Sequence, residues 1–178
     1  TFKSLTSWET GYAYKQFIKT FAENTESLIM GEPEDEYTTI QAGQATGELV
    51  GGNLSLFTKL VCGKYAVNLQ DKILFLEELG FEAAPEMVNS NIYYLKQNGV
   101  FDRIAGLWIG NYEHPSKVSI EKIIKNAIGD EYKFPIIKSD NFGHIDKKII
   151  IPIGTKAEIN TNEEIKIKLV EKCVDEGK

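Results

Sequence analysis

The sequence predicts an α/β domain in which helices pack on a mixed sheet. Two buried strands are expected over residues 72–77 and 103–109, because each is a nearly continuous apolar run. An amphipathic helix follows each strand, the first beginning at Pro85 and the second after Ser119, and each ends at a glycine. Further strands are expected over residues 134–138 and 147–153, and alternating apolar residues at 157–159 and 165–169 predict a closing antiparallel pair. Alternating strands and helices followed by strands alone are typical of a mixed sheet.

The N-terminal part of the chain predicts one helix and then a connection. Over residues 7–21 the apolar side chains recur at spacings of three and four, the pattern of an amphipathic helix. Residues 24–36 are acidic and contain Gly31 and Pro33, which predicts an exposed connection. We therefore place the main domain boundary after residue 36.

A glycine-rich stretch precedes the first buried strand. Residues 37–50 have weak strand character and lead to two glycines and Asn53. We expect Asn53 to cap a short helix over residues 54–61, closed by Gly63, because its side-chain oxygen can accept from a free N–H in the first turn.

Composition and charge exclude several classes of protein. At 178 residues the chain can bury one good core, and its formal net charge of -6 argues against nucleic-acid or anionic-membrane partners. Cys62 and Cys173 give neither a disulfide framework nor paired metal-ligand spacing, so we expect no metal site and a cytoplasmic setting. No apolar run approaches the roughly 20 residues that span a bilayer, and no signal peptide is recognised.

The two histidines are the first candidates for chemistry, since imidazole moves protons near neutral pH. His144 lies in a polar, glycine-containing loop between two predicted strands, where catalytic groups concentrate, although a surface role is also open. His114, which precedes Pro115, has no neighbour that suggests a role. From the residues alone, a surface role for His144 is favoured over a catalytic one.

Acidic residues at the end of strand 72–77 are the second candidates. Ligands in open α/β sheets bind outside the carboxyl ends of strands, and Glu77 and Glu78 lie there. A carboxylate in this place could orient a histidine, or could simply be solvated. Because neighbouring strand residues point to opposite faces, only one of the two can reach a given histidine.

Four ordered blocks of sequence carry a more specific signal. They are residues 47–54, 72–78, 99–107, and 141–144 with 151–154 behind them. Together they resemble the LD-carboxypeptidase family of serine peptidases, which includes the microcin C self-immunity proteins. The resemblance covers about residues 43–160, and its motif selects Glu77 rather than Glu78.

The resemblance implies a fold and a set of roles. The expected fold is the family's swivelling β/β/α C-terminal domain, with a mixed sheet and flanking helices, in an enzyme that forms homodimers and needs no cofactor. In this family an N-terminal domain supplies a nucleophilic serine, and the C-terminal domain supplies a glutamate and a histidine. These catalytic roles fall to Glu77 and His144, and Gly51, Gly52 and Asn53 are expected to shape the substrate site.

The nucleophile is the part of the family pattern that the sequence does not show. Residues 1–36 resemble the tail of the serine domain and its linker, and residues 37–178 resemble the C-terminal domain. Ser4, Ser7 and Ser27 lack the strand-to-helix context of the family's serine. We therefore expect the chain to be inactive by itself and to work with its own N-terminal serine domain.

The resemblance leaves two substrate classes open. One branch of the family removes a terminal D-amino acid from murein tetrapeptides, and the other cleaves aminoacyl or peptidyl adenylates of the microcin C type. The residues around His144, including Asp146, look more like the second branch. A non-catalytic ligand-binding module is the alternative, and nucleotide-phosphate binding by the glycines, which match no known phosphate motif, is a third possibility.

Overall fold

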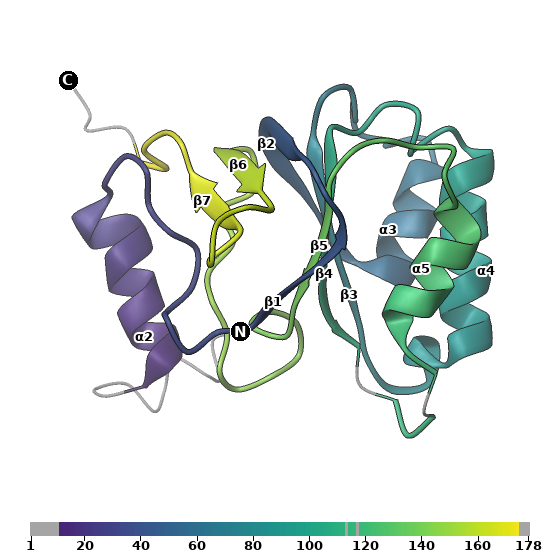
Figure 1. Ribbon diagram of the computed structural model, residues 1–178, viewed down its shortest axis with the longest axis horizontal. Helices are drawn as coiled ribbons and strands as arrows, with labels where there is room; N and C mark the ends of the chain where they lie inside the picture. The colour runs from purple at the N-terminus through teal and green to yellow at the C-terminus, as the bar shows by residue number, and fades with distance from the viewer. Residues whose placement is uncertain (1–10, 113, 117, 175–178) are drawn as a thin grey trace.

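The computed structural model describes residues 11–112, 114–116 and 118–174 (Figure 1). The strands within these residues are β1 (Tyr37–Gln41), β2 (Gln44–Asn53), β3 (Ile73–Glu78), β4 (Gly106–Tyr112), β5 (Ile136–Ser139), β6 (Lys156–Asn160) and β7 (Ile167–Leu169). They form one mixed sheet in the order β1-β5-β4-β3-β2-β6-β7. The four strands from β2 to β5 are parallel. At one edge β1 pairs antiparallel with β5, and at the other edge β6 pairs antiparallel with β2 and β7 with β6. The predicted α/β class with a mixed sheet is confirmed.

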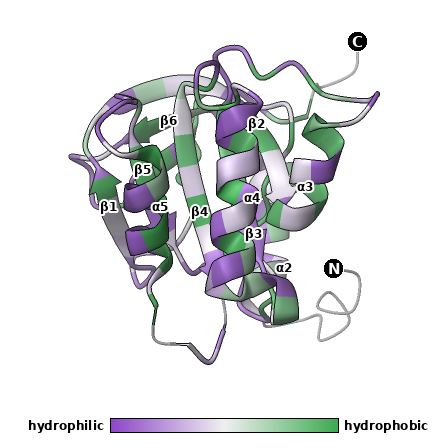
Figure 2. Cartoon of the chain, turned by 90° about the vertical axis from the view of Figure 1, so that its right-hand side faces the viewer, coloured by the Kyte–Doolittle hydropathy of each residue, from purple (hydrophilic) through white to green (hydrophobic). Residues whose placement is uncertain are grey.

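Three helices cover one face of the parallel strands, as Figure 1 shows. They are α3 (Leu54–Val61), α4 (Pro85–Gln97), preceded by the 3-10 turn η2 (Gly80–Ala83), and α5 (Ile120–Ile128). Figure 2 looks onto this layer and shows the helices in front of the strands. Leu74 and Leu76 of β3 point into the core beneath them. This core removes apolar surface from water and fixes β3 from the helical side.

The opposite face of the sheet is covered by its own curled edge. Ile73 and Phe75 of β3 share a second core with Ala157 and Ile159 of β6 and with β7. Outside this layer lie α2 (Tyr12–Phe17) and the π-helix η1 (Ile18–Glu23). Over residues 37–169 the layers are therefore the curled edge, the parallel strands and the three helices, which agrees with the predicted β/β/α architecture, and α2 and η1 add a layer outside it.

Helix starts agree with the capping residues in the sequence. Asn53 Oδ1 accepts from the backbone N–H of Leu56 at 3.2 Å, and Ser119 Oγ accepts from that of Lys122 at 3.3 Å. Each bond satisfies one of the backbone donors that a helix N-terminus leaves free. The predicted N-terminal helix is confirmed from residue 12, and its first predicted residues, 7–10, lie outside the described part.

Residues 24–36 contain no helix or named strand, as predicted for a connection, but the prediction that the connection is exposed holds only in part. Leu28 and Met30 are buried in the second core, and Ile29 forms an antiparallel bridge with Lys168 next to β7. The acidic composition of the segment hid the significance of Leu28 and Met30, two apolar residues at alternate positions. Their side chains are buried because the segment runs along an edge of the sheet.

The predicted strand at 147–153 is absent from the structure, which describes all seven of these residues. Ile149 donates its N–H to the carbonyl of Asn141 at 2.8 Å, within the loop that carries His144, and Pro152 has no N–H to give to a ladder. The apolar side chain of Ile149 still reaches the second core. Among the described residues, no helix is both long enough and apolar enough to cross a membrane.

Candidate active site

Glu77 occupies the carboxyl end of a fully buried strand. It is the fifth residue of β3, which lies between β2 and β4, and Asn53 of β2 is its partner in the parallel register. Because side chains alternate along a strand, Glu77 faces the same side as Phe75, and its side chain is only 9% exposed. The sheet holds this residue through its pairing with β2, whereas the pairing of β3 with β4 is irregular at this point.

His144 meets this carboxylate from the loop between β5 and β6. Its Nδ1 lies 2.9 Å from Glu77 Oε2, whereas 55% of its side chain is exposed. An ionised carboxylate only accepts hydrogen bonds, so a neutral imidazole facing it would hold its proton on Nδ1 and leave the lone pair of Nε2 free. The arrangement is therefore an oriented imidazole whose second nitrogen can accept a proton.

Aromatic packing fixes the loop just before the histidine. Phe142 is buried, and its ring packs against Trp108 at 4.6 Å between centroids and against Phe75 at 6.0 Å. The carbonyl of Phe142 accepts from the N–H of Asn111 at 3.0 Å. These contacts place the loop over the face of the sheet on which Glu77 lies.

A polar network holds the base of the same loop. Asn141 is buried, and its amide donates to the hydroxyl of Tyr37 at 2.8 Å and to Asp35 Oδ2 at 3.3 Å. Its Oδ1 accepts from Ser139 Oγ at 2.7 Å, and its carbonyl accepts from Ile149 N. A buried amide with this many partners has little freedom to turn.

Asp35 anchors this network, and no motif in the sequence indicated it. Its side chain is 4% exposed and lies 3.0 Å from Lys147 Nζ, and it accepts from the Tyr12 hydroxyl and from the Glu32 N–H. Burial raises the pKa of the Asp35 carboxyl, but the bonds from Tyr12, Glu32, Lys147 and Asn141 outweigh burial and lower it overall. The hydrogen bond to Asp35 in turn raises the pKa of Lys147.

Gly143 is the residue at which the loop touches the acid. Its φ is +126°, a conformation that favours glycine, and a Cβ there would lie 3.3 Å from Glu77 Oε2 and 3.2 Å from Asn111 Cβ. The glycine thus allows the backbone to approach the carboxylate closely, directly before His144.

The glycine-rich segment lies on the other side of Glu77, at the end of β2. A Cβ on Gly51 would lie 1.8 Å from the carbonyl oxygen of Phe75, so close strand packing accounts for this glycine. Gly52 faces open space, and a Cβ added to it would meet nothing within 4 Å. Asn53 lines a hollow of about 270 Å³ together with His144. The structure therefore brings Asn53 and His144 to one hollow, beside Glu77.

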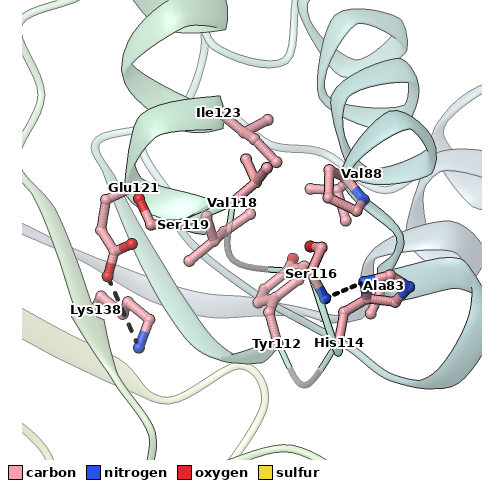
Figure 3. Close-up of a pocket in the computed structure, with 12 residues that line it drawn as sticks. Ala83, Val88, Tyr112, His114, Ser116, Val118, Ser119, Glu121, Ile123 and Lys138 are labelled. Atoms are coloured by element: carbon pink, nitrogen blue, oxygen red, sulfur yellow. Dashed lines mark hydrogen bonds and ion pairs between the residues drawn. The ribbon is translucent and has the colours of Figure 1, made fainter.

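Ser55 and His114 also line hollows of the described structure, but neither is part of a pair like that of Glu77 and His144. Ser55 lines the same hollow as His144, but its Oγ donates to Asn53 Oδ1 at 2.9 Å as part of the α3 cap. His114 lines a separate hollow of about 190 Å³ with Tyr112 (Figure 3), and its Nδ1 accepts from Ser116 N at 3.1 Å. Within the described residues, no group of three or more His, Cys, Asp or Glu side chains could hold a metal ion.

Comparison with known proteins identifies the domain. The family model for the LD-carboxypeptidase C-terminal domain matches residues 46–159. The probable murein peptide carboxypeptidase of Bacillus subtilis (strain 168) is 32% identical over 175 residues, which cover 94% of this chain and 51% of that protein.

Solved structures agree in fold. The microcin C7 self immunity protein MccF in complex with glutamyl sulfamoyl guanosine superposes with a TM-score of 0.76 at 19% identity, covering 91% of this chain and 56% of that chain. The muramoyltetrapeptide carboxypeptidase from Oxalobacter formigenes gives a TM-score of 0.70 at 19% identity, covering 90% and 54%.

These similarities extend over most of this chain but only part of each relative. The chain spans about half the length of the Bacillus subtilis protein, and about half of each of the two structures. The family model matches well over half of the chain, including Glu77 and His144. The chain therefore belongs to the LD-carboxypeptidase family and contains that family's C-terminal domain.

Proposed function

We propose that this chain supplies the histidine and the acid of a Ser-His-Glu triad in a serine carboxypeptidase. The observation that carries the proposal is the 2.9 Å contact between His144 Nδ1 and Glu77 Oε2, at the carboxyl end of a parallel strand. The serine comes from a domain outside residues 37–178, with residues 1–36 as that domain's tail and linker.

Each residue has a defined step in this mechanism. His144 Nε2 takes the proton of the serine hydroxyl as its oxygen attacks the carbonyl carbon of the substrate amide. The histidine then gives this proton to the leaving nitrogen as the C–N bond breaks, and water releases the acyl group by the same route. Glu77 accepts from Nδ1–H throughout, which keeps the productive tautomer and balances the imidazolium charge.

The surface around His144 supports a second domain at this place. The histidine side chain is about half exposed, and apolar side chains of Leu56 and Leu79 line its hollow while 63% and 38% exposed. Phe81, two residues further along, is 74% exposed. Apolar groups gathered beside an exposed catalytic histidine are suited to burial against another domain. By itself, the chain would lack the nucleophile and be inactive.

The substrate is an amide between an L-configured residue and a C-terminal group. Its two candidate forms are the L-to-D bond of murein tetrapeptides and an aminoacyl or peptidyl adenylate of the microcin C type. The first fits the name of the Bacillus subtilis relative, and the second fits aspartyl sulfamoyl adenosine, the ligand in another structure of MccF. Gly51, Gly52 and Asn53 would shape the substrate site beside the dyad. We place the enzyme in the cytoplasm as a homodimer.

The test uses the complete gene product that contains this chain. Hydrolysis of a murein tetrapeptide and of an aminoacyl sulfamoyl adenylate is measured for the parent and for Glu77→Ala and His144→Ala. Each substitution should lower kcat roughly 1000-fold or more without unfolding the protein. His114→Ala is the matched control, because His114 lies in a separate hollow, and it should keep parental turnover.

Each outcome separates the hypotheses. The substrate with the higher kcat/KM identifies the branch of the family. Parental turnover in folded His144→Ala or Glu77→Ala would remove that residue from the mechanism. No turnover by the parent on either substrate, combined with binding of one of them, would favour a non-catalytic ligand-binding module of the same fold.

A further inference from the structure

Glu78 is a buried carboxylate for which the proposed mechanism has no use. It follows Glu77 in β3 but points to the opposite face of the sheet, toward the helices, and it is only 1% exposed. A charge is rarely buried to this degree unless it has specific partners. The partners of Glu78 therefore indicate what it does.

The hydrogen bonds of Glu78 hold the junction between β2 and α3. Glu78 Oε2 accepts from the backbone N–H of Ser55 at 2.8 Å, in the first turn of α3. Oε1 accepts from the side-chain amide of Asn53 and from the N–H of Leu79 at 3.1 Å. These partners are an amide and two backbone N–H groups rather than a cation, and the N-terminus of α3 further favours a negative charge there.

The contact with Asn53 fixes how that side chain is turned. Asn53 Oδ1 accepts from Leu56 N and from Ser55 Oγ, so the oxygen must face α3 and the nitrogen must face Glu78. An amide nitrogen carries two hydrogens, and Glu78 takes one of them. The second remains available on a side chain that lines the same hollow as His144.

We propose that Glu78 is a positioning residue that holds the amide of Asn53 so that its second N–H is presented to an oxygen of the substrate beside His144. This inference rests on the proposed function, because it assigns the hollow to the substrate. Glu77 and Glu78, which are neighbours at the end of β3, then have different roles. Glu77 orients the base, and Glu78 orients a donor on the substrate-binding side.

The first test is a double-mutant cycle in the complete gene product. Glu78→Gln and Asn53→Ala should each lower kcat/KM about 10- to 100-fold, the loss expected for a hydrogen bond to a buried charged group, mainly through KM. The double variant should lose no more than the stronger single variant, because both act through one N–H. Glu86→Gln is the control, since it removes an exposed carboxylate near the start of α4 and should leave kcat/KM unchanged.

A second variant separates positioning from a purely structural role. In Asn53→Asp combined with Glu78→Gln, donor and acceptor are exchanged, so the contact between the two side chains can re-form with the new glutamine as the donor. The midpoint of thermal unfolding in the combined variant should lie closer to the parental value than the midpoint of Asn53→Asp or of Glu78→Gln alone. KM should stay high, because an aspartate has no second N–H to offer.

The outcomes distinguish this inference from the proposed function. Parental KM in Glu78→Gln, multiplicative losses in the double variant, or full recovery of KM in the exchanged pair would overturn the positioning role. If His144→Ala is inactive in the same assay while any of these is found, the proposed function stands and only the role of Glu78 fails. Full turnover by His144→Ala would instead remove the proposed function itself.

Discussion

The two members of the dyad are held in place by different kinds of structure. Glu77 belongs to β3, whose backbone is paired with β2 on one side and β4 on the other. His144 belongs to the loop of residues 140–149, which contains no strand or helix and is held by side chains from distant parts of the chain. The glutamate is thus fixed by the sheet and the histidine by tertiary contacts.

This difference separates the two ways in which the site can be damaged. A change that disturbs the pairing of β3 must disturb the central sheet, so its effect appears as lost stability of the whole domain. A change in the contacts of the loop can displace the histidine while the sheet stays intact, so its effect on activity exceeds its effect on stability. Substitutions on either side test this distinction.

The largest effect is expected on the sheet side, for Gly51→Ala. The new methyl group would lie 1.8 Å from the carbonyl oxygen of Phe75, so β2 and β3 must separate. We expect a loss of about 3–5 kcal/mol in the free energy of unfolding, measured by urea denaturation. Gly52→Ala is the control, because its φ of +146° brings the same type of backbone strain but its Cβ meets nothing within 4 Å.

Replacement of Asp35 by alanine tests the loop side. It removes a buried acceptor from Tyr12, Asn141 and Lys147, so we expect a loss of about 2–3 kcal/mol in the free energy of unfolding. Hydrogen exchange should speed up in residues 140–149 more than in β3, and turnover should fall with it. Glu34→Ala should change stability by less than about 0.5 kcal/mol, because that carboxylate is 63% exposed. Equal exchange in loop and strand would contradict the comparison.

Gly143→Ala acts where loop and strand meet. The positive φ and the 3.3 Å approach to Glu77 Oε2 both oppose a side chain there, and the expected cost is about 1–3 kcal/mol. Activity should fall about 10-fold or more, because a shifted backbone moves the imidazole off the carboxylate. Gly154→Ala separates the two causes, since Gly154 also has a positive φ of +89° but lies in open space and away from the dyad.

The difference between the sheet and the loop also determines which parts of the site could be predicted from the sequence. β3 and its terminal acids, the Asn53 cap and the Ser119 cap follow from local patterns, and the structure has each of them. β4 begins three residues later than predicted, at Gly106, because Arg103 turns back to bond the carbonyl of Gly99 after α4. Local apolar composition cannot distinguish a buried turn from a strand.

The contacts that place His144 depend on residues far apart in the chain. Asp35 lies in an acidic segment that predicted only an exposed connection, and its partner Asn141 is 106 residues away. No periodicity or capping pattern connects them. The histidine and the acid could be selected from the sequence only through the family resemblance, and the network that holds the histidine became visible only in the folded chain.

The smallest expected effect is a difference between the loop and β3 in how their stability depends on pH. Because the pKa of Asp35 is lowered from its ordinary value of 3.8, its contribution to stability is complete above that value and is lost as the pH falls through the folded-state pKa. Unfolding free energy should therefore fall with decreasing pH more steeply in the parent than in Asp35→Asn, measured by urea denaturation between about pH 5 and about pH 2. Near neutral pH the Asp35 contribution should not vary with pH. The intrinsic rate of amide exchange itself falls as the pH drops, so the comparison uses protection relative to that rate. Protection in residues 140–149 should decrease first, ahead of β3, because the loop loses its anchor while the sheet keeps its pairing. A simultaneous decrease would mean that the two regions open as one unit.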